Sequence, residues 1–146
     1  MRLQGNLRLE HDNGKPYYLA EVPELLIATD GETKEEALNM AQDAIGLLLE
    51  DHTNEKITAK DILIIPTEHG FDVSCADTTA LVSLVLKQMR GKSDMTLQNI
   101  TNKIGQKYVN AVRQYEAGQV EASFSKFQDL VFAMGYDVKL SLIKIA

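Results

Sequence analysis

Hydrophobic and polar residues alternate along the first part of the chain, and this two-residue period is typical of β-strands. The alternating apolar positions are Leu3, Leu7 and Leu9 in one segment and Tyr18, Ala20 and Val22 in the next. The segment Asp12-Asn13-Gly14 lies between them, and Asn-Gly readily adopts positive φ, so we expect a β-hairpin. Pro23 lacks a backbone donor and should end the second strand. A third short strand is predicted from Leu25 to Thr29.

The pattern then changes to a helical period. Thr33-Lys34-Glu35-Glu36 has the form of a capping box, in which Thr33 accepts from the backbone of Glu36. The apolar residues that follow at helical spacing are Ala37, Leu38, Ala41, Ala44, Ile45, Leu48 and Leu49. We therefore expect a helix from Lys34 to about Asp51.

Two short apolar segments follow this helix. The run Ile62–Ile65 is compatible with a strand, and Phe71, Val73 and Cys75 alternate with polar residues as a strand requires. The first part thus predicts the order β-β-β-α-β, with a further strand at Ile62–Ile65 left open. Strands covered by one helix form a small α+β layer.

The remaining residues predict four helices. Their apolar faces are, in order, Leu81, Val82, Val85, Leu86 and Met89; then Leu97, Ile100 and Ile104; then Tyr108, Val109, Val112 and Tyr115; and finally Phe124, Phe127, Leu130, Val131 and Met134. The second helix should begin at an N-cap Thr96, and glycines should separate or end the helices at Gly91, Gly105, Gly118 and Gly135.

The second and third of these helices resemble a helix-turn-helix pair joined at Gly105. The polar face of the third helix, predicted from Gln106 or Lys107 to Tyr115, holds Gln106, Lys107, Asn110, Arg113 and Gln114. Asn and Gln are side chains that read adenine, and Arg and Lys read guanine or contact phosphate. These five residues are the candidate DNA-binding residues. A plain four-helix domain with a solvated polar face remains the alternative.

The C-terminal segment Asp137–Ile145 alternates with period two and predicts a strand. Val138, Leu140 and Leu142 would point to one side. A single strand after four helices has no neighbour in that half, so we expect it to pair with the same strand of a second chain, with a buried position on its own chain as the alternative.

Charge divides the 146-residue chain at the same place as the pattern. Residues 1–77 hold 6 Lys or Arg and 16 Asp or Glu, a net charge of −10, whereas residues 78–146 hold 9 and 5, a net +4. We therefore expect two domains, 1–77 and 78–146, with different partners: a basic partner for the first and nucleic acid for the second. A chance difference between the halves of an acidic protein is the alternative.

The composition excludes several classes of protein. Its 45% hydrophobic and 25% charged residues are typical of globular chains, and the longest mostly apolar uncharged run, Thr78–Leu86, is too short to span a bilayer. The start of the chain has no apolar segment of signal-peptide length, and Cys75 is the single cysteine, so we expect a reducing, cytoplasmic setting without disulfides.

Motifs for catalysis are missing from the sequence. There is no nucleophile–base pair, phosphate loop or metal motif, so we expect no enzyme, no cofactor and no metal. Glu21, Glu24 and Asp30 lie near strand ends and would be the residues of a nuclease metal cluster. Solvated turn carboxylates are the favoured interpretation.

The chain resembles the HicB family of bacterial antitoxins over nearly its whole length. The matching segments are Tyr17–Leu25, with its Tyr-rich strand and Pro-Glu step, Ala28–Thr33, with its Thr/Gly turn, and the acidic, Ala-rich helix Glu35–Ile45. The second half looks like the family branch that carries a helix-turn-helix. It departs from the usual pattern at Thr101, four residues before Gly105, where Ala is common.

This resemblance implies a partial RNase H-like first domain without catalytic activity and a DNA-binding second domain. A protein of this kind would neutralise a HicA-like toxin, which is a small basic mRNA-cleaving ribonuclease, and would repress its own operon by binding operator DNA. A homodimer or higher oligomer is expected. The other hypotheses are a stand-alone transcription regulator whose first domain senses a ligand or protein, and, less favoured, a nuclease.

Overall fold

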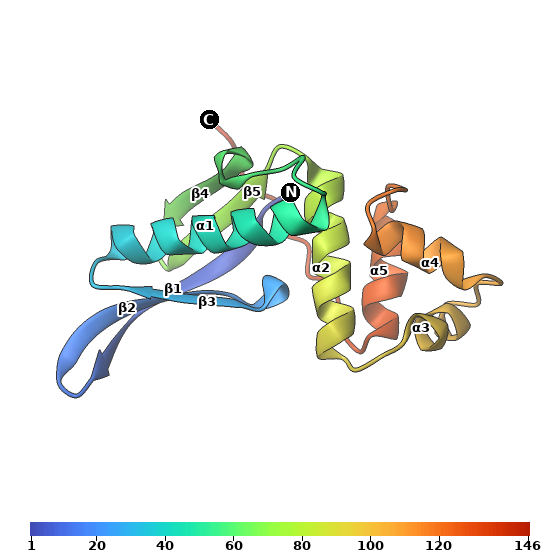
Figure 1. Cartoon of the computed structure of the whole chain (residues 1–146), viewed down its shortest axis with the longest axis horizontal. Coiled ribbons are helices and arrows are strands. Elements are labelled where there is room, and N and C mark those ends of the chain that lie inside the picture. Colours follow the sequence, from blue (N-terminus) through green and yellow to red (C-terminus); the bar gives the residue numbers. More distant parts are fainter.

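The chain folds as an α+β protein with a five-stranded antiparallel sheet and five α-helices (Figure 1). The computed structural model describes residues 1–146. Its elements, in chain order, are β1 (Leu3–Asp12), β2 (Lys15–Val22), the 3-10 helix η1 (Pro23–Leu25), β3 (Ile27–Gly31), α1 (Lys34–His52), the 3-10 helix η2 (Ala59–Asp61), β4 (Ile62–Thr67), β5 (Gly70–Cys75), α2 (Thr78–Lys92), α3 (Leu97–Lys103), α4 (Val109–Glu116) and α5 (Phe124–Ala133).

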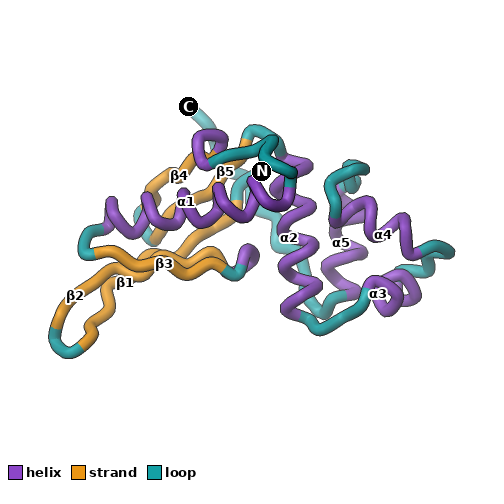
Figure 2. The backbone as a smooth tube through the Cα atoms, viewed as in Figure 1, coloured by secondary structure: helices purple, strands orange, loops and turns teal.

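The sheet has the strand order β3-β2-β1-β5-β4. Only the first part of β1 pairs with β5, from Leu3 opposite Val73 to Asn6 opposite Gly70. Pairing of β1 with β2 continues to Asp12 opposite Lys15. The β1–β2 hairpin therefore extends past the end of β5 and leaves the body of the sheet, as Figure 2 shows. Its turn is confirmed, because Asn13 and Gly14 adopt φ values of 49° and 79°.

Helix α1 lies across one face of this sheet, in contact with β2, β3 and β4 (Figure 1). Thr33 caps it as predicted, accepting from the Glu36 backbone N–H at 3.1 Å, although the Glu36 carboxylate accepts from Glu32 N–H. The helix buries Ala37, Ala41, Ile45 and Leu49 completely. Small alanines at the first two of these positions let the helix backbone approach the sheet.

The observed elements differ from the predicted order β-β-β-α-β in two places within the sheet. Both β4 and β5 follow α1, so the strand left open at Ile62–Ile65 is present, and helices and strands are interspersed along the chain. Strand β3 begins at Ile27 and not at Leu25, because Pro23–Leu25 form a 3-10 turn and Leu26 adopts a positive φ of 55°. Proline at the start of such a turn presets its φ and lacks the donor that a strand would need.

The predicted C-terminal strand is absent from this chain, and residues 134–146 form no strand or helix. Val138 packs partly against the core, but Leu140 and Leu142 are exposed, Leu142 to 90%. A strand is stabilised by hydrogen bonds to a neighbour, and this segment pairs with no strand of the five-stranded sheet. The alternating pattern alone is therefore insufficient for a strand within one chain.

Helix α2 packs against both parts of the molecule. One side contacts η1 and α1, and the Gln88 side-chain amide donates to the Leu25 carbonyl at 3.2 Å. The other side contacts α4 and α5. As a result, one cluster of 25 buried hydrophobic residues runs through the α/β part and the helical part. The sequence placed a boundary after Asp77, but the helix that follows contributes to the packing on each side of it.

Candidate functional site

The turn between α3 and α4 is built from local hydrogen bonds. Thr96 and Asn99 cap the start of α3 reciprocally, as a capping box. At the end of α3, Gly105 has a φ of 69°, and the Gln106 backbone N–H donates to the Thr101 carbonyl at 3.0 Å. A left-handed glycine is the usual way to end a helix and redirect the chain. Thr101 is buried, and its hydroxyl donates to the Leu97 carbonyl.

Helix α4 presents three predicted DNA-binding residues together on its exposed side. Asn110, Arg113 and Gln114 are exposed, whereas Val112 and Glu116 are buried on the opposite side. The Arg113 guanidinium donates from Nη1 to Asn110 Oδ1 at 3.0 Å. The two side chains therefore form a paired polar surface in which donors and acceptors of both residues remain available to a base edge.

The other two predicted residues lie before the helix and not on it. Gln106 is half-buried in the turn, and Lys107 is exposed beside it. The sequence predicted that the helix begins at Gln106 or Lys107, but it begins at Val109, because Tyr108 is extended with φ of −127° and ψ of 132°. These two side chains thus extend the polar surface beyond the N-terminal end of α4.

Tyr108 is the residue at this surface that sequence reasoning misplaced. It was assigned to the apolar face of the helix, yet its side chain is 65% exposed, and the Lys107 ammonium lies 5.3 Å from its ring centroid. The helical projection fails at this residue because its backbone is extended. The signal that could have indicated this was the polar run Gly105-Gln106-Lys107, which delays the start of the helix.

A buried ion pair fixes α4 against α2. Arg90 donates from Nε to Glu116 Oε1 at 2.6 Å and from Nη1 to the Met95 carbonyl at 3.2 Å. Burial raises the pKa of the Glu116 carboxyl, and the hydrogen bond and charge of Arg90 oppose that rise. The arrangement holds the end of α4, and hence the direction of its exposed face.

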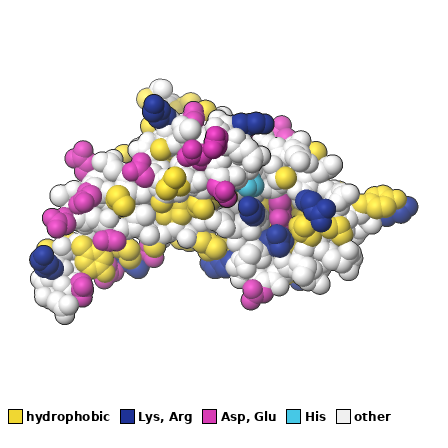
Figure 3. Space-filling model, viewed as in Figure 1, with side chains coloured by type: hydrophobic (Ala, Val, Ile, Leu, Met, Phe, Trp, Pro, Cys, Tyr) yellow, Lys and Arg dark blue, Asp and Glu magenta, His cyan; other side chains and the backbone are white.

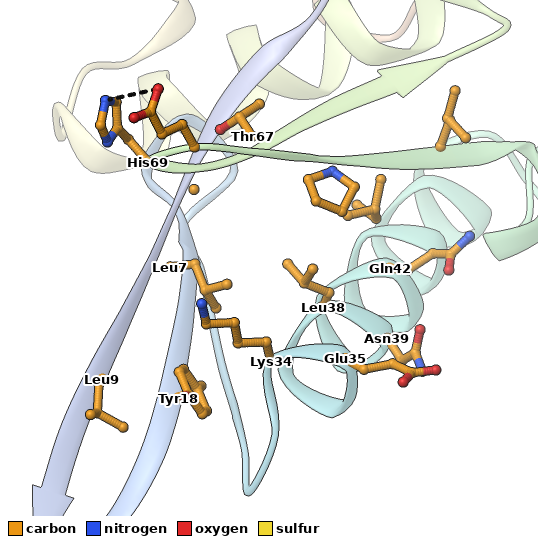
Figure 4. A pocket seen from close by; sticks show the side chains of 15 residues that line it. Leu7, Leu9, Tyr18, Lys34, Glu35, Leu38, Asn39, Gln42, Thr67 and His69 are labelled. Atoms are coloured by element: carbon orange, nitrogen blue, oxygen red, sulfur yellow. Dashed lines mark ion pairs between the residues drawn. The ribbon is translucent and has the colours of Figure 1, made fainter.

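A second feature is an apolar groove in the acidic part, where β1 separates from β5 (Figure 4). It has a volume of about 900 Å³ and lies between α1, the β1–β2 hairpin and the β4–β5 turn. Its apolar wall comes from Leu7, Leu9, Tyr18, Leu38, Leu63, Ile64 and Pro66, and its polar rim from Lys34, Glu35, Asn39, Gln42, Thr67, Glu68 and His69. Apolar floors with polar rims are typical of protein-binding surfaces.

Surface charge follows the division seen in the sequence. In Figure 3, acidic side chains gather mainly over α1 and the sheet, and basic ones mainly over the helical part.

The three carboxylates considered for a nuclease metal cluster have different surroundings. Glu21 pairs with Arg8 at 3.1 Å, Asp30 is exposed, and Glu24 has one buried oxygen without a hydrogen-bond partner. No group of three or more His, Cys, Asp or Glu side chains is arranged to hold a metal ion.

Comparison with known proteins adds no family to this description: no protein-family model and no curated protein matches the chain. None of the helices has the length and apolar character that crossing a membrane would require.

Proposed function

We propose that the protein is an antitoxin of the HicB type, which binds operator DNA through α4 and neutralises a HicA-like toxin through its acidic part in the cytoplasm. The observation that carries the proposal is the exposed polar face of Asn110, Arg113 and Gln114, on a short helix that follows α3 through a glycine turn. Recognition helices of helix-turn-helix proteins place such a face in the major groove. The net +4 charge of residues 78–146 favours the phosphate backbone.

The DNA part of the proposal is tested with the promoter region upstream of the protein's own gene. Arg113→Ala should weaken binding by about 1–3 kcal/mol and relax the preference at one operator position. Lys107→Ala should weaken binding evenly on all sequences and reduce the salt dependence, as expected for a phosphate contact. Lys126→Ala, on α5, provides a matched loss of one positive charge away from this face. Equal affinity of wild type for promoter and random DNA would contradict the proposal.

The toxin part rests on the groove and on the charge of −10 in residues 1–77. A basic partner would be drawn to this part by its field, and an apolar side chain of that partner would fill the groove. We include in the same proposal that residues 1–77 form a partial RNase H-like domain without catalytic activity.

Neutralisation is measured as protection of mRNA from the short basic protein encoded in the neighbouring reading frame. Glu35→Lys combined with Glu68→Lys, on the groove rim, should weaken protection strongly. Asp51→Lys changes charge at the far end of α1 and should retain protection. Full protection by the rim variant would move the partner elsewhere on the surface.

A second candidate function is a transcription regulator whose first part senses a ligand, and the groove also supports this alternative. The neighbouring reading frame distinguishes the antitoxin from the ligand-sensing regulator, because an antitoxin requires a short basic protein encoded beside it.

A further inference from the structure

Tyr108 is the one large side chain at the α4 face whose position has no structural explanation. Tyr18, Tyr115 and Tyr136 pack against the hydrophobic core, Tyr17 is half-buried on β2, and Tyr108 is the one exposed tyrosine. Its ring is 65% exposed, and the neighbouring Lys107 ammonium lies 5.3 Å from the ring centroid. Exposing an aromatic ring gives up the free energy that burial would supply, so the fold itself gains little from this residue.

The ring lies where α4 would first meet a nucleic acid. Tyr108 is the N-cap of α4, two residues before Asn110 and directly after Lys107. Figure 1 shows that the loop between α3 and α4 forms the end of the helical part that is farthest from the sheet. The N-terminal residues of a recognition helix contact base edges, so a side chain at the N-cap is placed beside the bases that the first turn reads.

We propose that Tyr108 is a specificity-determining residue of the DNA interface, and that its ring packs against the 5-methyl group of a thymine beside the bases read by Asn110 and Arg113. The inference rests on the proposed DNA-binding function. In the major groove the thymine methyl is the apolar feature that distinguishes base pairs, and side chains read it by apolar contact.

Because Lys107 lies beside it, the Tyr108 ring is assigned to a base contact and not to a phosphate contact. Lys107 is exposed beside the ring and supplies the positive charge that a phosphate attracts. The ring adds an apolar surface, which a phosphate does not bind and a methyl group does. If the phenolic hydroxyl were the important group, as in a phosphate contact, Tyr108→Phe would lose binding.

The experiment measures affinity of the full-length protein for its own promoter DNA, in which each thymine is replaced singly by uracil, the same base without the methyl group. For the wild type, one replacement should lower affinity by about fourfold, the factor for burial of one methyl group. Tyr108→Ala should bind the unmodified DNA about tenfold more weakly and should no longer respond to that replacement. Tyr108→Phe should bind within twofold of wild type and keep the response.

Two controls separate this role from folding. Leu47→Ala removes an equally exposed apolar side chain from α1 and should leave DNA affinity unchanged. Thermal unfolding of Tyr108→Ala should match wild type, because the ring is outside the core.

Wild-type affinity of Tyr108→Ala would overturn the inference. So would an unaltered response of that variant to the critical uracil, or an equal loss on random DNA. These results leave the DNA-binding proposal standing, because wild type would still prefer the promoter. A wild type that binds promoter and random DNA equally would overturn both.

Discussion

Arg90 of α2 and Glu116 of α4 form an ion pair with an Nε to Oε1 distance of 2.6 Å, and Glu116 is only 7% exposed. The carboxyl is buried between α2, which packs against η1 and α1, and α4, which has the candidate DNA-binding face. Breaking a buried pair by removing one partner costs far more than the pair contributes, because the remaining charge is left without compensation.

Arg90→Ala should therefore lower the free energy of unfolding by about 3 kcal/mol at pH 7, the lower end of the range for buried pairs, since Arg90 is partly exposed. Loss of Arg90 removes the hydrogen bond and the charge that chiefly oppose the rise of the Glu116 pKa, and leaves only the smaller effect of the Lys87 charge. When the folded-state pKa of Glu116 lies above its unfolded value, stability is greatest at low pH. Stability then falls as the pH rises from the unfolded pKa through the folded pKa.

The stability gap between wild type and Arg90→Ala should accordingly be smaller at pH 5 than at pH 7, as measured by urea unfolding. Adding Glu116→Gln to the variant should remove this pH dependence. A gap that is constant with pH would mean that the carboxyl is not the group left unpaired.

A second prediction concerns His52, whose Nε2 lies 2.7 Å from Ser83 Oγ. The Ser83 hydroxyl donates its single proton to the Ala80 carbonyl, so His52 Nε2 is the donor in the contact with Ser83. Burial, followed by the charge of Lys87, lowers the pKa of His52, while Asp51 opposes the shift. A lowered histidine pKa gives stability that is complete above pH 6.5 and is lost as pH falls below it.

Wild type should thus lose stability between pH 7 and pH 5 through this residue, and His52→Gln should lose less over the same range. NMR titration checks the cause directly: the His52 pKa should lie below the ordinary histidine value of about 6.5 and should rise in Lys87→Ala. A His52 that titrates at or above about 6.5 would contradict the assignment.

A third prediction concerns the close approach of Gly5 to Phe71. A Cβ at Gly5 would lie 2.3 Å from the Phe71 ring, which is fully buried in the core. Gly5→Ala should destabilise the protein by about 1–3 kcal/mol through overpacking. Gly91→Ala is the matched control, because a Cβ there meets nothing within 4 Å and alanine favours the helix.

Adding Phe71→Leu to Gly5→Ala tests the mechanism. The smaller side chain should make room for the new methyl group, so the double variant should lose less than the sum of the single losses. Additive losses in urea unfolding would place the strain elsewhere.

A fourth prediction concerns the C-terminal segment, which forms no strand in the single chain. Deleting Lys139–Ala146 removes exposed Leu140 and Leu142 and keeps Val138, which packs on the core. If this segment pairs with its copy, the truncated protein should be a monomer in sedimentation and should lose promoter binding. Leu140→Pro should do the same by removing a donor, while Leu140→Val should remain a dimer. A truncated dimer would place the contact elsewhere.

Local signals in the sequence predicted the elements well where each element depends on a few neighbouring residues. The Asn13-Gly14 hairpin and the Thr33 and Thr96 caps are confirmed. Turns and caps are decided within about four residues, so their chemistry is visible in the sequence. The same logic failed at Tyr108, where the turn after Gly105 moved the start of the helix from Gln106 or Lys107 to Val109.

The candidate site was predictable only in part. Asn110, Arg113 and Gln114 share a face because helical spacing alone brings them together. The groove between α1 and the β1–β2 hairpin could not be predicted from the sequence. It depends on where β1 stops pairing with β5, and that pairing joins segments far apart in the chain.

The sequence by itself determined the type of most elements, the helix caps and the division of charge, since these follow from side-chain chemistry at short separation. The tertiary structure decided that α2 contributes to both parts of the core, that Arg90 pairs with Glu116, and that the C-terminal segment pairs with no strand of its own chain. These outcomes depend on which surfaces pack together, and packing joins residues far apart in the chain that no local pattern relates.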